Sequence, residues 1–203
     1  MCSRFLADCD VHEQARRFQV RSTLAIWHAQ EPCIPTGPVL SIIQDQTRRL
    51  GSMCWGWPRV IEGSQRLLLH SRAESVSRRA TFSEAFQRRR CVVLLTAWME
   101  PQRGANGKPR PGRWPPWVVI PADGEAMAVA ALWECVDGGR VVLMTTAACP
   151  LIAHISDRMP ALLLGDHVDQ WLDPATPAKR LHALLGPSQP PLMGATQAQG
   201  KPG

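Results

Sequence analysis

Short apolar runs alternate along this sequence with clusters of proline, glycine and charged residues. The runs are rich in valine, isoleucine and leucine and are too short to predict long helices, which favours strands. The prolines and glycines between them mark turns. Strands are therefore predicted within residues 37–45, 91–100, 114–124, 126–136 and 140–149, and "MCWGWPRV" at residues 53–60 is predicted to form an aromatic loop.

Four other segments have the pattern of short helices, at residues 9–19, 77–90, 167–173 and 178–185. In the second of these, Phe82 and Phe86 are four residues apart and would share one helical face. Residues 186–203 have no hydrophobic period and are rich in proline, glycine and glutamine, which predicts a disordered tail. The predicted fold class is α+β, with residues 1–185 forming a single β-rich, barrel-like domain of twisted, mainly antiparallel strands.

The charge balance favours an anionic partner. The 203 residues include 23 lysines and arginines against 17 aspartates and glutamates, a net charge of +6, which points first to nucleic acid. The seven cysteines are odd in number and form no C-x-x-C pair, so a disulfide scaffold or zinc ribbon is not expected. No apolar run approaches the roughly 20 residues of a membrane helix. We therefore expect a monomeric cytoplasmic protein with no membrane partner.

No motif for a nucleotide cofactor, a metal or a serine nucleophile occurs in the sequence. It has no Walker loop, no G-x-G-x-x-G, no H-E-x-x-H and no G-x-S-x-G. Neither a cofactor nor a metal is therefore predicted.

Cys2 has the most unusual chemistry in the chain. Removal of Met1 would leave Cys2 with a free α-amine and a thiol on neighbouring carbons. An α-amine has a pKa near ~7.7–8.0 and a thiol one near ~8.5, so both are partly deprotonated at neutral pH. The amine can condense with an aldehyde, and the thiol can then close on the imine to give a thiazolidine. The alternative is that position 2 belongs to a disordered terminus.

Polar residues at the ends of apolar runs are further candidates. His70, Arg72 and Glu74 alternate with small residues in "LHSRAES", and on a strand they would share one face, which is either part of a site or an ordinary solvent face. Glu100 follows a buried run in "AWMEP" and could act as a general acid or base, or could simply be exposed.

Arg158 lies in the segment "HISDRMP". An arginine held in place there could bind a phosphate bidentately. The alternative is an ion pair with Asp157 or another carboxylate.

Taken in order, these segments resemble the SOS response-associated peptidase (SRAP) family, whose members process abasic sites in single-stranded DNA. The resemblance rests on "MCSRF", "CIPTG", "WGW", "LHSRAES", "AWMEP", "ALWE", "TTAA", "DRMP" and "WLD", which span residues 2–173 in unbroken order. It implies a compact β-rich domain with a positive groove for single-stranded DNA. It also implies association with the nucleoid during DNA damage.

The resemblance assigns roles to individual residues. Cys2 matches the family's nucleophile, which attacks the aldehyde of an abasic site to form a thiazolidine DNA–protein crosslink, and Glu100 matches its acid/base glutamate. The resemblance also implies that the same cysteine carries self-processing peptidase and lyase activity. The residues that match DNA contacts are Arg4, Arg72 and Arg158 for phosphates, Trp55 and Trp57 for stacking on bases or wedging between them, and Thr145 in the matching strand.

The chain also departs from the family pattern. Ser3 replaces a glycine, His70 an asparagine, Pro101 a tryptophan and Ser156 a histidine, and no closing strand is recognisable in the tail. His154 lies two residues before Ser156 and, on a strand, would share its face about 6–7 Å away. Whether His70 or His154 replaces the missing histidine stays open. His70 and Ser156 both occupy positions that match catalytic residues of the family, so both are candidate catalytic residues.

Three functions remain open at this point. The first is an abasic-site crosslinker that uses Cys2 and Glu100, with His70 as a further polar or acidic group. The second is a weakened paralogue that binds single-stranded DNA without efficient crosslinking. The third is a cysteine peptidase acting on other proteins, with His70 as the base for a cysteine.

Overall fold

In the computed structural model the described residues are 4–29, 32–101, 116–187 and 193–197. Strands make up most of the regular structure. They are β1 (Arg4–Leu6), β2 (Arg21–Ser22), β3 (Pro38–Gln44), β4 (Arg48–Trp55), β5 (Trp57–Ile61), β6 (Ser64–Leu68), β7 (His70–Arg72), β8 (Arg90–Leu95), β9 (Ala97–Glu100), β10 (Trp117–Pro121), β11 (Met127–Glu134), β12 (Arg140–Ala147), β13 (Arg158–Pro160) and β14 (Met193–Gln197). The helices are α1 (Val11–Arg17), the 3₁₀ helix η1 (Val76–Arg78), α2 (Ala80–Arg88), α3 (Pro150–Ala153), α4 (His167–Leu172) and α5 (Ala178–Leu184).

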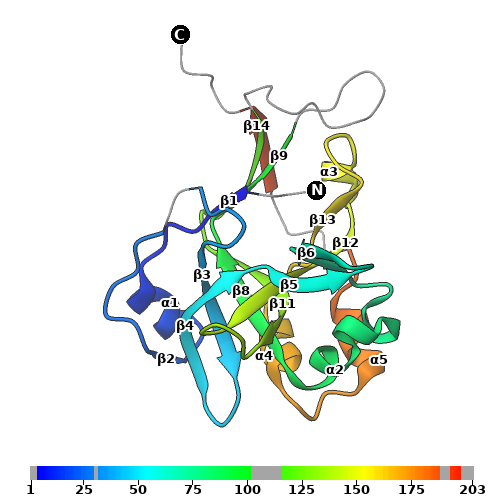
Figure 1. Ribbon diagram of the computed structural model, residues 1–203. Coiled ribbons are helices and arrows are strands. Elements are labelled where there is room, and N and C mark those ends of the chain that lie inside the picture. The colour runs from blue at the N-terminus through cyan, green and yellow to red at the C-terminus, as the bar shows by residue number, and fades with distance from the viewer. Residues whose placement is uncertain (1–3, 30–31, 102–115, 188–192, 198–203) are drawn as a thin grey trace.

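A closed ring of strands forms the centre of the molecule (Figure 1). The order β12-β11-β8-β3-β4 is antiparallel throughout, and β12 then pairs in parallel with β4 to complete the ring. Strands β7 and β13 both add to β12, at the same end of the ring. This arrangement confirms the prediction of a β-rich, barrel-like fold with mainly antiparallel strands.

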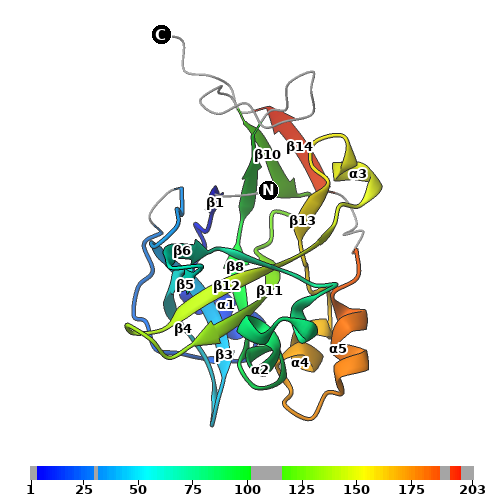
Figure 2. The same ribbon diagram turned by 45° about the vertical axis from the view of Figure 1, so that its right-hand side comes forward.

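A smaller sheet, in the order β1-β9-β10-β14, stands above the ring (Figure 2). Its buried residues Phe5, Trp98 and Val119 belong to the same core cluster as Val93 and Val129 of the ring. The small sheet is therefore joined to the ring by a continuous apolar core, which fixes its position over the ring.

The ring strands β3, β8, β11 and β12 are buried on both faces. Val92 and Leu94 of β8 face a cluster that includes Phe86 of α2, whereas Val93 and Leu95 face the ring interior. Helices α2, α4 and α5 lie together against the outer face of the ring (Figures 1 and 2). A strand covered on both sides reads as a continuous apolar run, and this explains why the sequence shows little alternation here.

The predicted helices at residues 9–19, 77–90, 167–173 and 178–185 correspond to α1, α2, α4 and α5. The single strand predicted at residues 91–100 is wrong, because the run divides into β8 and β9, which belong to different sheets. Thr96 lies between the two strands.

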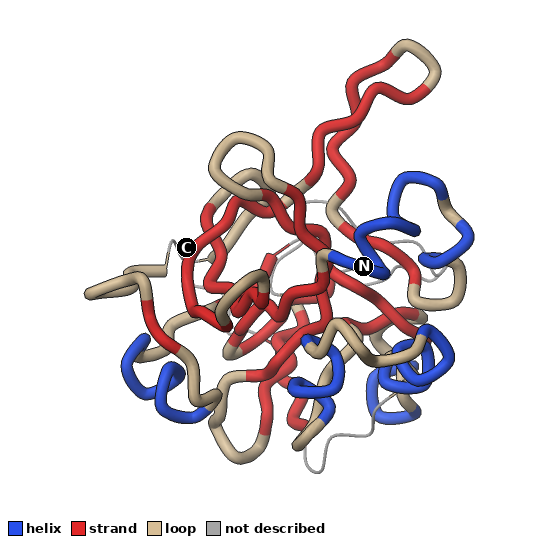
Figure 3. The backbone as a smooth tube through the Cα atoms, turned by 90° about the horizontal axis from the view of Figure 1, so that it is seen from below, coloured by secondary structure: helices blue, strands red, loops and turns tan. Residues whose placement is uncertain are grey.

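The aromatic loop predicted at residues 53–60 is also wrong, because the segment is the end of β4 and the start of β5. Gly56 separates them with a φ of 114°, a conformation that glycine adopts far more readily than other residues. A Cβ at this position would also lie 2.9 Å from the Leu67 side chain. Beyond this bend, β5 and β6 form a hairpin that projects from the body of the molecule (Figure 3).

The tail prediction needs correction as well. Strand β14 lies inside residues 186–203 and pairs antiparallel with all of β10, from Trp117 opposite Gln197 to Pro121 opposite Met193. For these five residues the prediction of a disordered tail is wrong. The sequence "MGATQ" has too few large apolar residues to predict a strand, so its pairing with β10 identifies it as one.

Candidate functional site

A small cavity lies where β1, β7, β9, β12 and β13 meet. Its polar lining comes from His70, Glu100, Thr145 and Arg158, with Phe5 beside them. The remaining lining is apolar and consists of Leu95, Leu143, Met144, Met159 and Pro160. The fold thus brings together four residues that the sequence identified separately, from strands far apart in the chain.

Glu100 ends β9 and is 2% exposed. Strand β9 pairs with β1 on one side, where Arg4 is opposite Met99, and with β10 on the other, where Trp117 is opposite Glu100. Cys2 lies outside the described residues. Because it is two residues from Arg4, the chain keeps the two Cα atoms within about 7 Å. Through this short connection Cys2 is tethered to β1, the strand that pairs with β9.

His70 begins β7 and is held by both backbone and ring contacts. It pairs in parallel with Leu143 of β12, and its ring meets the Trp55 ring edge-on, with centroids 5.7 Å apart and planes at 78°. Imidazole can donate and accept protons, so His70 brings acid/base chemistry to the same cavity as Glu100.

Arg158 forms an ion pair with a carboxylate, the second of the two predicted alternatives. Its Nη1 and Nη2 donate to the two carboxylate oxygens of Glu74 at 2.6 and 2.9 Å, and Nη2 also donates to the Thr145 carbonyl at 2.7 Å. The hydrogen bonds from Arg158 lower the pKa of Glu74. The partner is therefore Glu74 and not Asp157, and the edge of the guanidinium expected to bind phosphate is occupied.

Ser156 and His154 do not line the cavity. Ser156 is 1% exposed, and its hydroxyl accepts a hydrogen bond from the Arg158 backbone N–H at 3.4 Å. His154 directly follows α3, so the strand geometry assumed for this segment is wrong. Its ring contacts Trp117 instead. Of the two histidines considered, the structure places His70 and not His154 in the cavity.

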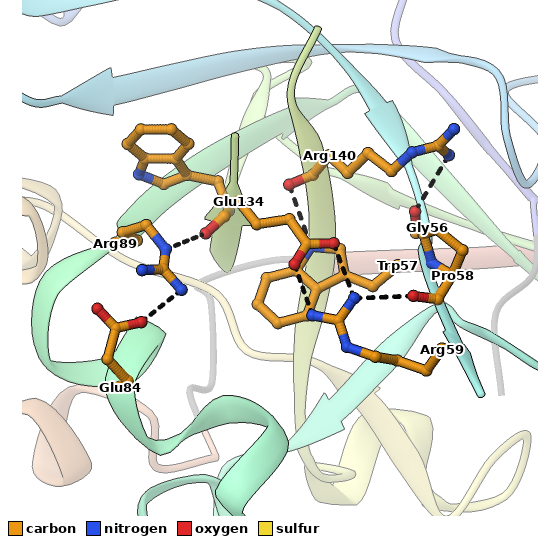
Figure 4. Close-up of polar contacts among 9 residues, drawn as sticks. Gly56, Trp57, Pro58, Arg59, Glu84, Arg89, Glu134 and Arg140 are labelled. Carbon is orange, nitrogen blue, oxygen red and sulfur yellow. Dashed lines mark hydrogen bonds and ion pairs between the residues drawn. The ribbon is translucent and has the colours of Figure 1, made fainter. Parts of the chain in front are cut away.

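Trp55 and Trp57 are fully buried, so the expectation that they stack on bases is wrong for this structure. Their indole N–H groups donate to the carbonyls of Leu69 and Arg140, each at 3.1 Å. Arg59 covers the Trp57 ring and pairs with a carboxylate of β11, as Figure 4 shows. Both rings pack in the core, because the chain on either side of Gly56 is strand.

Arg4 and Arg72 are exposed, as a role in binding an anion requires. Arg72 ends β7 opposite Thr145 of β12, next to the cavity. Ser71 and Ala73 are buried on either side of it, so the predicted alternation of this segment is confirmed. Arg72 is thus an exposed cation close to the cavity, whereas Arg158 is held by Glu74.

Within the described ranges, no group of three His, Cys, Asp or Glu side chains is arranged to hold a metal ion. None of the helices described is both long and apolar enough to cross a membrane.

The family described as SOS response associated peptidase (SRAP) matches residues 1–199. The chain belongs to the SRAP family. A related protein, the abasic site processing protein YoqW of Bacillus subtilis, is 26% identical over 201 residues, which cover 92% of this chain and 87% of YoqW.

Two solved structures share the fold of this SRAP protein. A protein from Bacteroides thetaiotaomicron has a TM-score of 0.81 at 18% identity, covering 98% of this chain and 92% of its own. A protein from Bordetella bronchiseptica has a TM-score of 0.77 at 21% identity, covering 98% of this chain and all of its own. At these identities the similarity establishes the fold alone.

Sequence reasoning missed two features of this SRAP site. One is Glu74 as the partner of Arg158, although the sequence did predict a carboxylate as one alternative. The other is the contact between Trp117 and His154, which lie 37 positions apart in sequence and belong to different elements. Nothing in the spacing of these residues predicts either contact, because each depends on how β10, β13 and the segment after β7 are assembled.

Proposed function

We propose that this protein processes abasic sites in single-stranded DNA by forming a thiazolidine crosslink through Cys2. The observation that carries the proposal is the cavity that joins Glu100 and His70 beside the start of the chain. Membership of the SRAP family supports it, as does the name of YoqW. The net charge of +6 is consistent with a DNA partner.

The reaction needs only groups that the chain and the lesion supply. The Cys2 amine attacks the aldehyde carbon of the opened sugar, and loss of one water gives an imine. The Cys2 sulfur then bonds to the imine carbon, and the thiol proton ends on the nitrogen. The product is a closed thiazolidine ring, and no oxidant, metal or cofactor takes part.

Glu100 and His70 are suited to move the protons of these two steps. The hydroxyl of the first adduct must be protonated to leave as water, and the thiol must lose its proton before it attacks. General acid–base groups need to lie within hydrogen-bond reach of the reacting atoms. The carboxylate ends β9 and the imidazole begins β7, on the same cavity, so each can approach a group tethered to β1.

Arg4 and Arg72 are the proposed phosphate contacts, since both are exposed. Arg158 has a different role, because its two terminal nitrogens already bind Glu74. Its Nε is buried and makes no hydrogen bond to any described residue, so Arg158 is proposed to form part of the cavity wall and not to contact phosphate. The Thr145 carbonyl accepts a hydrogen bond from Arg158 Nη2 and so helps to hold the guanidinium in place.

A weakened DNA-binding paralogue is the second candidate. Ser156 lies where the family resemblance expects a histidine, and it does not line the cavity. Loss of that acid/base group would slow the reaction without removing the exposed arginines.

Incubation with a single-stranded oligonucleotide that contains a natural abasic site tests the proposal. We expect a covalent band on a denaturing gel with the parent protein and no band with Cys2→Ala. Cys2→Ala should still shift the oligonucleotide on a native gel, because the cation contacts remain. Cys135→Ala is the matched control, since Cys135 is exposed but has no α-amine, and it should crosslink like the parent.

Each outcome selects one function. A native-gel shift without any covalent band would favour the weakened paralogue. Equal crosslinking by Cys2→Ala and the parent would mean that another residue is the nucleophile, and the proposal would be wrong.

A further inference from the structure

An exposed aromatic pair lies beside the cavity. The rings of Trp117, on β10, and His154, after α3, have centroids 5.8 Å apart and planes at 83°. His154 is exposed and Trp117 is half-buried. The two side chains therefore present aromatic surface to solvent, unlike the buried rings of Trp55 and Trp57.

The sheet register places this pair next to Glu100. Trp117 is directly opposite Glu100, and two residues further along Val119 is opposite Trp98. Directly opposed residues in an antiparallel pair lie on the same face, with Cβ atoms about 4.5–5.5 Å apart. Because Trp98 and Val119 are fully buried, this face is the one that packs on the ring. Trp117 extends the same face from the cavity toward solvent, where it meets His154.

The core does not account for the position of Trp117. Among the tryptophans in the described part of the chain, it is the one that belongs to or packs against neither hydrophobic cluster. An aromatic ring that is partly exposed and adds little to the core is well placed to contact a ligand.

We propose that Trp117, held edge-on by His154, forms a stacking platform for the nucleobase that flanks the abasic site. The inference rests on the proposed function and names the part of the DNA that this surface recognises. An abasic site has no base of its own, so the neighbouring base provides the nearest π-face. Stacking on aromatic side chains tolerates every base, which suits a protein that must act on a lesion in any sequence.

The platform can be tested with DNA that binds without reacting. A tetrahydrofuran analogue of the abasic site has no aldehyde, and 2-aminopurine placed on its 5′ or 3′ side reports stacking by loss of fluorescence. We expect the parent protein to quench the probe on one of the two sides. Trp117→Ala should abolish the quenching and weaken binding about 5- to 140-fold, the range for 1–3 kcal/mol of stacking per base.

Variants separate stacking from other contributions. Trp117→Phe keeps a ring and should retain most of the affinity, and His154→Ala should weaken binding without disturbing the core. Ile120→Ala is the matched control, because Ile120 is 41% exposed on the same strand but on its other face. Stacking involves no phosphate, so Trp117→Ala should leave the salt dependence unchanged. Arg72→Ala should instead reduce the slope of log affinity against log salt by about 0.7.

The outcomes distinguish the platform from the function. If the parent binds and crosslinks abasic DNA but Trp117→Ala and His154→Ala bind like Ile120→Ala and still quench the probe, the platform is wrong and the function stands. If the parent neither binds the analogue nor crosslinks a natural abasic site, the function and the platform both fail. Should Trp117→Ala not fold, as judged by circular dichroism, His154→Ala decides the question.

Discussion

At the scale of single residues, the ion pair between Glu74 and Arg158 fixes one side of the cavity. The Glu74 carboxylate accepts hydrogen bonds from both terminal nitrogens of the guanidinium, and the Thr145 carbonyl accepts a further one from Nη2. Arg158 is thereby fixed in position on β13, with its side chain 13% exposed. Glu74 acts as a positioning residue that keeps the arginine against β12.

This pair predicts a pH-dependent contribution to stability. Arg158 lowers the pKa of Glu74 in the folded protein, so the pair stabilises at neutral pH and loses its contribution as the pH falls through that lowered pKa. Glu74 is 52% exposed, so solvent screening limits the effect of Glu74→Gln to roughly 1 kcal/mol or less at neutral pH.

Urea unfolding of the parent and of Glu74→Gln, at neutral pH and in steps toward acid, measures this contribution. The gap between the two proteins should close as the pH falls. Glu62→Gln, at the exposed turn of the β5–β6 hairpin, is the control and should match the parent throughout. A gap that stays constant or widens in acid would mean that the pair does not provide the stability.

Glu100 and His70 carry the chemical prediction at this scale. Glu100→Gln keeps the shape of a side chain that is 2% exposed but removes its ability to exchange a proton. We expect it to slow crosslinking by about 10²–10⁴-fold, with a smaller loss for His70→Asn. Single-turnover crosslinking rates measure both variants, with Glu62→Gln as the control. An unchanged rate in Glu100→Gln would exclude the carboxylate as the proton shuttle.

The sequence predicted several of these residues and misplaced others. His70, Glu100, Thr145 and Arg158 were identified from local motifs, and the fold brings them to one cavity. Ser156 was assigned by position, yet it is buried away from the cavity lining, because a short helix and not a strand leads into β13. Position along a motif predicts a role only when the local backbone is also predicted correctly.

At the scale of elements, one buried arginine joins β8 to two helices. Arg90 is 5% exposed and donates to the carbonyls of Phe86 and Gln87 in α2 and of Trp171 and Asp173 at the end of α4. These carbonyls lie at helix ends, where backbone acceptors have no partner within the helix. Arg90 thus satisfies the ends of both helices and fixes them against the ring.

Replacing this arginine should cost much of the stability of the fold. We expect Arg90→Met to lower the free energy of unfolding by about 3 kcal/mol or more, since each buried carbonyl left without a donor costs about 1–3 kcal/mol. Arg88→Met, at an exposed position two residues earlier, should stay within about 0.5 kcal/mol of the parent. Urea denaturation compares the three proteins. Equal stability of Arg90→Met and Arg88→Met would contradict the proposed role.

Elements with their own hydrophobic pattern were predictable, and those defined by a partner were not. The four-residue spacing of Phe82 and Phe86 predicted α2, and both side chains do face the core. The boundary at Thr96 was missed because the run on either side of it is apolar, and only the division into two sheets separates β8 from β9. Strand β14 was missed because its evidence is the backbone pairing with β10.

At the scale of the whole molecule, the ring and the small sheet place the start of the chain beside residues from its distant parts. Strand β1 lies against β9, whose end carries Glu100, while β7 and β13 reach the same cavity from β12. The sequence predicted the fold class from its apolar runs, but the closure of β12 on β4 could not be deduced from local patterns. That closure brings His70, from the segment after β6, to the cavity.

The central claim is that Cys2 closes a thiazolidine ring on an abasic site, and mass spectrometry of the covalent product tests it most directly. The predicted product has the mass of the chain without Met1 plus that of the abasic oligonucleotide, less one water. Its peptide map places the DNA on Cys2. Borohydride should leave it unchanged, because a thiazolidine has no imine to reduce. A product that retains Met1, carries the DNA on another residue or gains two hydrogens with borohydride would contradict the claim.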